Sequence, residues 1–280
     1  MPSVSLTVAG IEVVAVSVAG IETCIEIPGW QLCFDLGRCP HTAVRRKRVC
    51  VTHAHVDHLG GLVHHVSQRD LLGMPPATYH VPHHAVDGVE ALLAGWRGLD
   101  RSELPANVVG VRPGDQIEVG SHRRIRAFKS VHRVPTLGYA LVRDHVGLLP
   151  ELVGRPSAEI RARLQRGEPI NVPGEQVEVV FCGDTRIDVV DREPMVRRAR
   201  LLVLECTFLG PGRHEQARRT GHVHLDEIAE RADLFENEAI LLTHFSLRYG
   251  PQEILAAVGR LPERLRGRVV PLLGSHPAHT

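Results

Sequence analysis

The chain has 280 residues, which is enough for one large domain or two small ones and for a buried core without disulfides. Hydrophobic residues make up 43% and charged residues 23%, and the net charge of +1 excludes a histone-like polybasic protein. The apolar stretches are only strand-sized and no basic segment precedes them, so we expect a cytoplasmic protein with six reduced cysteines and no membrane partner.

The first predicted elements are short strands. The pentapeptide VAGIE occurs twice, at Val8–Glu12 and Val18–Glu22, and glycines separate β-branched runs around each copy. This pattern indicates successive antiparallel strands. A strand over residues 31–34 follows, then a basic loop over 45–48, and a buried strand over 49–52 leads directly into His53.

Downstream, predicted strands alternate with predicted helices, which is typical of a single α/β domain over residues 1–280. The predicted strands cover residues 77–81, 108–111, 116–119, 124–130, 137–142, 177–181, 201–204 and 239–242, and the predicted helices cover 83–95, 157–166, 224–234 and 251–261. Residues 147–173 are punctuated by proline and glycine, and we expect them to form a short insertion or lid.

Histidine is abundant, with 18 copies, and it is the commonest metal ligand in proteins. The strongest signal is the run His53-Ala54-His55-Val56-Asp57-His58, directly after a predicted strand. Residues i and i+2 at a strand end project to the same side, so His53 and His55 can share one metal. The turn that follows can direct Asp57 and His58 at a second ion. A ligand set without thiolates suits zinc, manganese or iron in a hydrolytic site.

Three further residues of ligand type, His132, Asp184 and His244, each follow a predicted strand. The ends of strands are where α/β sheets collect their functional residues. The sequence therefore predicts a site for two divalent metal ions with seven ligands: His53, His55, Asp57, His58, His132, Asp184 and His244.

These residues, together with Asp35-Leu36-Gly37, resemble the metallo-β-lactamase superfamily over nearly the whole chain. In the C-terminal third, three segments resemble motifs of the RNase Z branch: Glu205-Cys206-Thr207-Phe208-Leu209, Gly221-His222 and the hexapeptide HFSLRY at 244–249. The resemblance implies an αββα sandwich of two mixed sheets flanked by helices, and a homodimer.

The resemblance also implies an assignment of the ligands. His53, His55 and His132 would hold one metal, and Asp57, His58 and His244 the second, with Asp184 bridging them. The ions would be zinc, with manganese and iron as alternatives. Water activated by the two ions would attack phosphorus in line, and Asp57 would orient or deprotonate that water.

The resemblance further implies a proton donor and a substrate contact. His222, kept charged by Glu205, would protonate the leaving group as general acid. His224 stands where the family usually has threonine and is a second candidate for this role. Ser246 and Arg248, just past a ligand, would contact a phosphate oxygen.

Two RNase Z features have no counterpart in the sequence: a PxKxRN-type loop before Cys39, and a Gly/Pro-rich flexible arm between His132 and Asp184 that clamps tRNA. We therefore expect a dinuclear metal-dependent phosphodiesterase acting on either a tRNA 3′ end or a smaller diester such as a cyclic nucleotide. The alternative is a hydrolase of a carboxylic substrate, namely a lactone, thioester or β-lactam. Glu205 and His222 favour the phosphodiesterase, because acyl hydrolysis at such a site does not require that acid pair.

Overall fold

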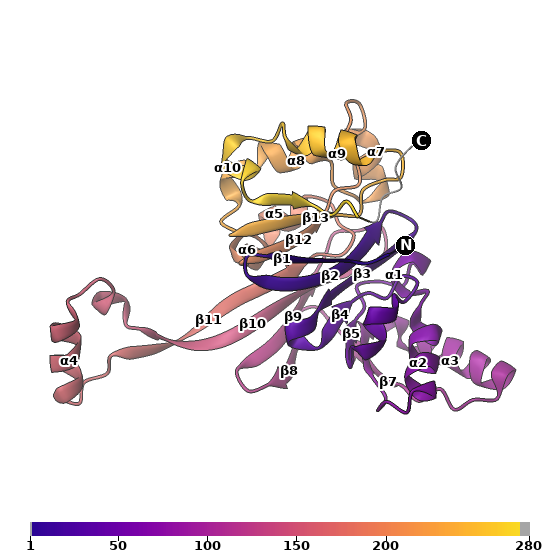
Figure 1. Ribbon diagram of the computed structural model, residues 1–280, viewed down its shortest axis with the longest axis horizontal. Coiled ribbons are helices and arrows are strands. Elements are labelled where there is room, and N and C mark those ends of the chain that lie inside the picture. Colours follow the sequence, from indigo (N-terminus) through magenta and orange to yellow (C-terminus); the bar gives the residue numbers. More distant parts are fainter. Residues whose placement is uncertain (1, 275–280) are drawn as a thin grey trace.

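The computed structural model describes residues 2–274, which form four layers in the order helices, sheet, sheet, helices (Figure 1). The strands of the first sheet lie in chain order: β1 (Val4–Val8), β2 (Ile11–Val18), β3 (Glu22–Ile27), β4 (Leu32–Phe34), β5 (Arg48–Cys50), β6 (Thr78–Pro82) and β7 (Asn107–Val111). The second sheet has the order β14 (Val269–Pro271), β13 (Ala239–Thr243), β12 (Leu201–Glu205), β11 (Asn171–Phe181), β10 (Leu137–Leu148), β9 (Arg123–Lys129) and β8 (Gln116–Gly120). The αββα sandwich implied by the resemblance is confirmed.

Both sheets are mixed, as predicted, and in the same way. Strands β1 to β4 pair antiparallel and β4 to β7 pair parallel, while β8 to β11 pair antiparallel and β11 to β14 pair parallel. The two VAGIE copies end β1 and β2 and lead into the next strand, with Gly10 and Gly20 both at a φ of 71° in the turns. This confirms the predicted antiparallel strands.

Apolar side chains from both sheets fill the space between them. The ring of Phe34 stacks on those of Phe181 and Tyr139, at centroid distances of 5.1 and 6.2 Å. In β12, Leu201 packs into this inter-sheet core and Leu202 packs beneath the helices. Because β12 is covered on both faces, its first four residues are a continuous run of apolar residues without alternation. All six cysteines are buried and free.

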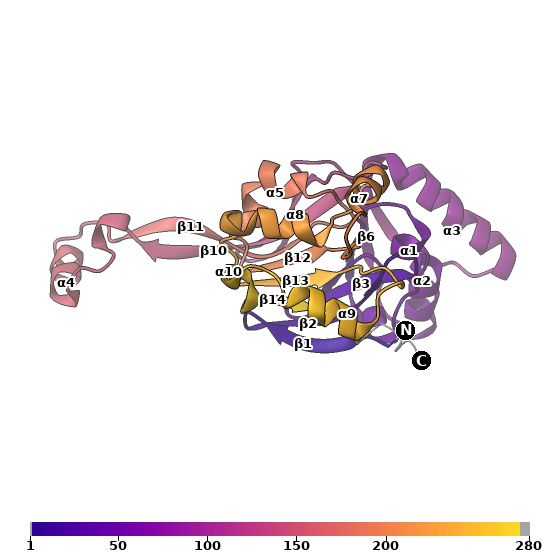
Figure 2. The same ribbon diagram turned by 90° about the horizontal axis from the view of Figure 1, so that it is seen from above.

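Helices cover the outer face of each sheet (Figure 2). On the first sheet lie α1 (Val56–Leu59), α2 (Leu62–Leu71) and α3 (Val86–Asp100). On the second lie α5 (Asp188–Arg192), α6 (Pro194–Arg198), α8 (Leu225–Glu230), α9 (Pro251–Val258) and α10 (Glu263–Arg266), with α7 (His214–Thr220) beside them. Five single 3₁₀ turns complete the described part of the chain: η1 (Pro28–Trp30), η2 (His41–Arg45), η3 (His83–Ala85), η4 (Pro150–Leu152) and η5 (Ala232–Leu234).

No helix among residues 2–274 is long and apolar enough to cross a bilayer. The sequence reading did not predict α5, α6, α7, α10 or β14, which are all seven residues or shorter. Helices this short display less than two turns of the 3.6-residue pattern, and a three-residue strand is too short to show a pattern of alternation. Periodicity alone therefore does not reveal these elements.

The predicted insertion at 147–173 is the outer part of a longer two-stranded extension tipped by α4 (Ser157–Gln165), which projects from the body (Figure 1). Its strands are mostly exposed beyond Val142 and before Val177, so they lack the apolar pattern that marks a buried strand. Strand β10 starts at the candidate site, where Leu137 donates its backbone N–H to the carbonyl of Thr52. At about 3.3 Å per residue the strand carries its end roughly 36 Å away, so the insertion lies far from the predicted ligands.

The turn between α1 and α2 leaves no room for a side chain at Gly61, since a Cβ there would lie 2.5 Å from the backbone nitrogen of Cys39. We expect Gly61→Ala to lower the free energy of unfolding, measured in urea, by about 1–3 kcal/mol because backbone must move. The control is Gly95→Ala in α3, where open space surrounds the position; there we expect a gain of up to about 1 kcal/mol. Equal stability of the Gly61→Ala protein and the unmodified protein would contradict this.

Candidate active site

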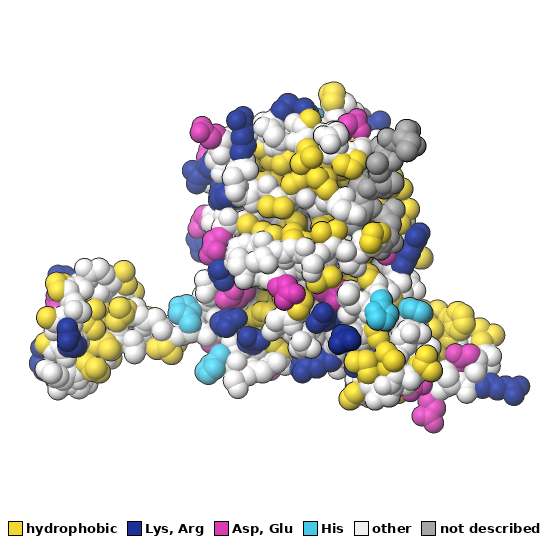
Figure 3. Space-filling model, in the orientation of Figure 1, with side chains coloured by type: hydrophobic (Ala, Val, Ile, Leu, Met, Phe, Trp, Pro, Cys, Tyr) yellow, Lys and Arg dark blue, Asp and Glu magenta, His cyan; other side chains and the backbone are white. Residues whose placement is uncertain are grey.

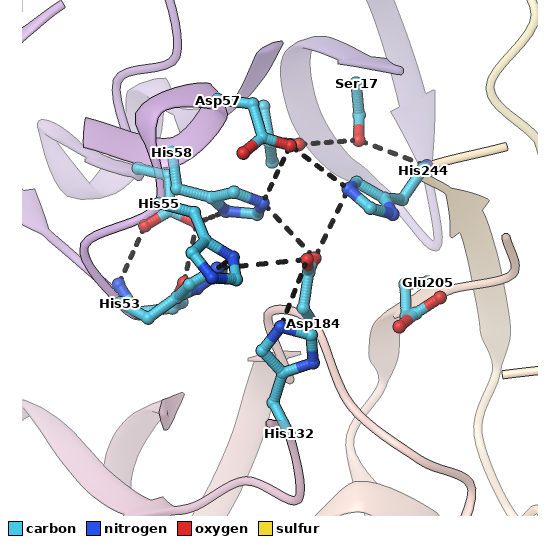
Figure 4. A network of polar contacts seen from close by, with 12 residues as sticks. Ser17, His53, His55, Asp57, His58, His132, Asp184, Glu205 and His244 are labelled. Carbon is cyan, nitrogen blue, oxygen red and sulfur yellow. Dashed lines mark hydrogen bonds and ion pairs between the residues drawn. The ribbon is translucent and has the colours of Figure 1, made fainter. Parts of the chain in front are cut away.

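The predicted ligands lie at the edge where strands of both sheets end. His53 follows β5, Asp184 follows β11 and His244 follows β13, while His132 lies in the β9–β10 connection. The short helix α1 begins after His55 and carries Asp57 and His58. The structure brings all seven predicted ligands together in one cluster (Figure 4).

In each of two groups, the predicted ligand atoms lie within 4.8 Å of one another: His53, His55, His132 and Asp184 in one, and Asp57, His58 and His244 in the other. A third group, Asp184, Glu205, His222 and His244, overlaps both. Asp184 lies between the first two groups. Its Oδ2 is 3.9 Å from His53 Nε2 and 4.0 Å from His132 Nε2. Its Oδ1 is 3.3 Å from His58 Nε2 and 3.4 Å from His244 Nε2. One carboxylate therefore presents a different oxygen to each group.

Three nitrogens of the cluster have no hydrogen-bond partner among the described residues. These are the buried Nε2 atoms of His58, His132 and His244. A buried polar atom without a partner costs about 1–3 kcal/mol, and a metal ion would remove that cost by accepting the lone pair. Imidazole nitrogens and carboxylate oxygens without thiolate are donors that zinc, manganese and iron accept. The residues present thus fit a pair of divalent cations.

The protonation state of His53 also suits a metal ligand. Burial, together with the neighbouring His58, lowers the pKa of this imidazole to about 2. The ring is therefore neutral near pH 7. A histidine must be in this form to bind a metal, because the lone pair on the nitrogen makes the bond.

Asp35, at the end of β4, orients one of the ligands from behind. His58 donates from Nδ1 to Asp35 Oδ2 at 2.7 Å, while the backbone N–H of Thr52 donates to Asp35 Oδ1 at 2.7 Å. Such a contact fixes the ring orientation and leaves Nε2 for the cluster. The sequence reading quoted Asp35 as part of a motif without giving it a role; its position directly after a strand was the available signal.

Thr207 supports a second ligand in the same manner. Its hydroxyl accepts from His244 Nδ1 at 2.9 Å and donates to Glu205 Oε2 at 2.7 Å. His132 donates from Nδ1 to the carbonyl of Gly221 at 2.8 Å. Thr207 and Gly221 also stood in quoted motifs without a role, because contacts across 37 and 89 residues are not visible in local sequence.

His222 and Glu205 form a pair at the rim of the cluster. Glu205 ends β12, and its Oε1 accepts from His222 Nδ1 at 2.7 Å and from the backbone of Thr185 at 3.0 Å. Burial alone would lower the pKa of His222, but the charge of Glu205 and this hydrogen bond raise it to about 9. The ring therefore carries a proton near pH 7, and its Nε2 remains for a substrate.

His224, the second candidate proton donor, has no nitrogen left for a substrate. The side chain is fully buried, Nε2 donates to the carbonyl of Gly210 at 2.8 Å, and Nδ1 accepts from the backbone of Asp226 at 3.2 Å. The residue caps the N-terminus of α8. His214 and Asp226 also lie close to it, but this separate group of ligand-type residues uses a His224 nitrogen that is already bonded.

Ser246 and Arg248 lie just beyond His244. Arg248 Nε donates to Ser246 Oγ at 2.9 Å, and the guanidinium lies 5.6 Å from the ring centroid of Phe208. Arg248 is exposed and Ser246 half-buried, so both remain accessible. Tyr249 instead packs in the core beneath the helices, where its hydroxyl accepts from the backbone of Leu209 at 3.2 Å.

Comparisons with known proteins agree with this arrangement. A family model described as "Beta-lactamase superfamily domain" matches residues 35–245. The Arabidopsis thaliana protein tRNase Z TRZ1 is 39% identical over 271 residues, covering 96% of this chain and 97% of that protein. From the same plant, tRNase Z TRZ2, chloroplastic, is 33% identical over 92% of this chain and 73% of its own length. The crystal structure of the short form of human tRNase Z has a TM-score of 0.55 at 19% identity, over 88% of this chain and 93% of that one.

The contact between Asp35 and His58 generates a prediction. We expect Asp35→Asn to lower the affinity for divalent metal by roughly 10–100-fold, because the amide is a weaker acceptor for His58 Nδ1. The measurement is the metal retained after dialysis against a competing chelator. The control is Asp100→Asn, whose carboxylate only accepts from Ser102 at the end of α3. Equal metal retention in both variants would remove Asp35 from this role.

Proposed function

The chain belongs to the tRNase Z family of the β-lactamase superfamily, and on this basis we propose that it hydrolyses phosphodiester bonds at the 3′ end of precursor tRNA. As a member of this family it is a metal-dependent hydrolase. The observation that carries the proposal is the carboxylate of Asp184, which presents one oxygen to each group of ligands and lies beside the Glu205–His222 pair. A smaller phosphodiester, such as a cyclic nucleotide, is the competing substrate.

In this proposal two divalent ions are held by the two ligand groups. His53, His55 and His132 hold the first, and Asp57, His58 and His244 hold the second, with Asp184 shared. Zinc is the proposed metal, with manganese and iron as alternatives. Bound there, the ions supply the Lewis acidity that lowers the pKa of water and neutralises phosphate charge.

Side chains of the protein orient the attacking water and move the protons. Asp57, held by the backbone N–H of Gly20 at 3.0 Å, orients the attacking water and accepts the proton that the water loses. As the water oxygen bonds to phosphorus, the bond from phosphorus to the leaving oxygen breaks. His222 gives its Nε2 proton to that oxygen, while Glu205 holds the ring through Nδ1. The products are a phosphate monoester and a hydroxyl group.

Ser246 and Arg248 are the proposed contacts to a non-bridging phosphate oxygen. Both lie within four residues of the ligand His244, and the exposed guanidinium of Arg248 already bonds Ser246 Oγ. A guanidinium can bind a phosphate with two parallel hydrogen bonds, so it would orient the diester as well as attract it. The cytoplasmic location expected from the sequence stays a prediction.

A homodimer is part of the proposal, carried over from the resemblance to the family. Light scattering of the purified protein should give twice the 30.9 kDa of one chain. The mass of a single chain at micromolar concentration would contradict it.

The proposed acid role of His222 is tested with a 3′-extended precursor tRNA. The metal-loaded protein should cleave it, and His222→Ala should lower kcat by about 10²–10⁴-fold, because no proton reaches the leaving oxygen. Metal content should be unchanged, since His222 is not among the proposed ligands. In contrast, His55→Ala should abolish cleavage together with part of the bound metal.

The matched control is His41→Ala, which removes an exposed histidine from η2. Unchanged turnover in His222→Ala would remove this residue from the acid role. Cleavage of bis-p-nitrophenyl phosphate without cleavage of tRNA would assign a small diester as substrate. Activity on a panel of lactones and thioesters, with none on either diester, would contradict the proposal that the protein is a phosphodiesterase.

A further inference from the structure

A hollow of about 660 Å³ opens beside the ligand cluster and shares His132 with it. Its walls come from the end of β6 and η3, the turn between β7 and β8, the β9–β10 connection and the last residue of α5. His132 stands in the β9–β10 connection, so one wall continues directly into the candidate active site. A chain bound at the metals can therefore extend into this hollow.

Four cationic side chains line the hollow and no acidic side chain does: Arg112, Lys129, Arg133 and Arg192. All four are exposed. Within residues 2–274, none of them forms an ion pair with a carboxylate. The hollow is thus a concentration of positive charge that the protein itself does not neutralise.

Several other arginines of the molecule are neutralised by carboxylates. On the extension, Arg163 pairs with Glu151 and Arg166 pairs with Glu168. At its base, Arg124 contacts both Asp144 and Glu175. The tip of the extension presents a mixture of charged and apolar side chains (Figure 3). The net charge of the whole chain is only +1, so the four cations that line the hollow are a local concentration of charge and not part of an overall excess of basic residues.

The floor of the hollow is apolar. Val111, Val131, Val134 and Pro135 line it, as do the imidazole rings of His83 and His84, but no Phe, Tyr or Trp side chain does. Backbone phosphates of a nucleic acid bind lysine and arginine at the rim of such a groove, while sugars and base edges can lie on apolar side chains. The imidazoles of His83 and His84 are exposed and can stack on a base, but with four cations around the hollow binding here would depend on charge more than on base identity.

We propose that this hollow is the subsite for the single-stranded RNA next to the scissile phosphate. Arg112, Lys129, Arg133 and Arg192 hold successive backbone phosphates there. They come from three segments of the chain, the β7–β8 turn, the end of β9 with the connection after it, and the end of α5, and this spread suits a chain of phosphates better than one anion. The inference rests on the proposed function and deepens it. A small diester reaches only the metals, whereas an RNA strand also occupies the hollow.

The test uses a triple variant, Arg112→Gln, Lys129→Gln and Arg192→Gln, which leaves Arg133 beside the ligand His132 untouched. Its dissociation constant for a single-stranded RNA oligonucleotide is measured by fluorescence anisotropy between 50 and 200 mM salt. Three lost phosphate contacts should make the slope of log affinity against log salt shallower by about 2. The ratio of kcat/KM for precursor tRNA to kcat/KM for bis-p-nitrophenyl phosphate should fall by about tenfold or more, through KM.

The control triple is Arg45→Gln, Lys47→Gln and Arg101→Gln, which removes three exposed cations that do not line the hollow. It should leave the salt slope and the ratio unchanged, and thermal unfolding shows whether both triples are folded. An equal change of the salt slope and the kcat/KM ratio in both triple variants, or an unchanged slope in the first, would contradict the proposed subsite. Because anisotropy requires no turnover, it tests the hollow even if no diester is cleaved, and that outcome would overturn the proposed function instead.

Discussion

The candidate active site depends on one buried carboxylate, that of Asp184, which has imidazoles on both sides. Its side chain is only 3% exposed, and an uncompensated charge in such a place costs several kcal/mol. His58 and His244 approach one oxygen, and His53 and His132 approach the other. Cations shared between these groups would compensate the carboxylate and also satisfy the unpartnered histidine nitrogens. The same arrangement therefore explains the burial and favours two metals.

This arrangement requires both sheets to end at the same edge. Ser17 of β2 accepts the backbone N–H of His244 at 3.1 Å, across 227 residues of sequence. Asp35, beyond β4, holds His58, which lies on the first sheet's side of the cluster. The inter-sheet core around Phe34 sets the distance between the sheets, and these hydrogen bonds set the orientation of the rings. Folding and assembly of the site are consequently one event.

Charge is distributed so that the chain as a whole is nearly neutral while the surface beside the site is not. Salt bridges neutralise Arg163 and Arg166 of the extension, whereas Arg112, Lys129 and Arg192 have no such partner among residues 2–274. The electrostatic potential at the surface beside the site, and not the net charge of the protein, attracts a polyanion to that place. An overall charge of +1 thus excludes a polybasic protein but leaves room for RNA binding at a defined groove.

The sequence by itself determined the ligand types and the nature of the fold, because the spacing of His53, His55, Asp57 and His58 after a strand is a local property. It also indicated His222 and Glu205 through the family motifs. The tertiary structure decided that both nitrogens of His224 are bonded within the protein, which leaves His222 as the proposed proton donor. It likewise revealed the roles of Asp35 and Thr207, and the length of the extension beyond Val142. These features depend on contacts between distant segments or on strands without an apolar face, and neither leaves a periodic pattern in the sequence.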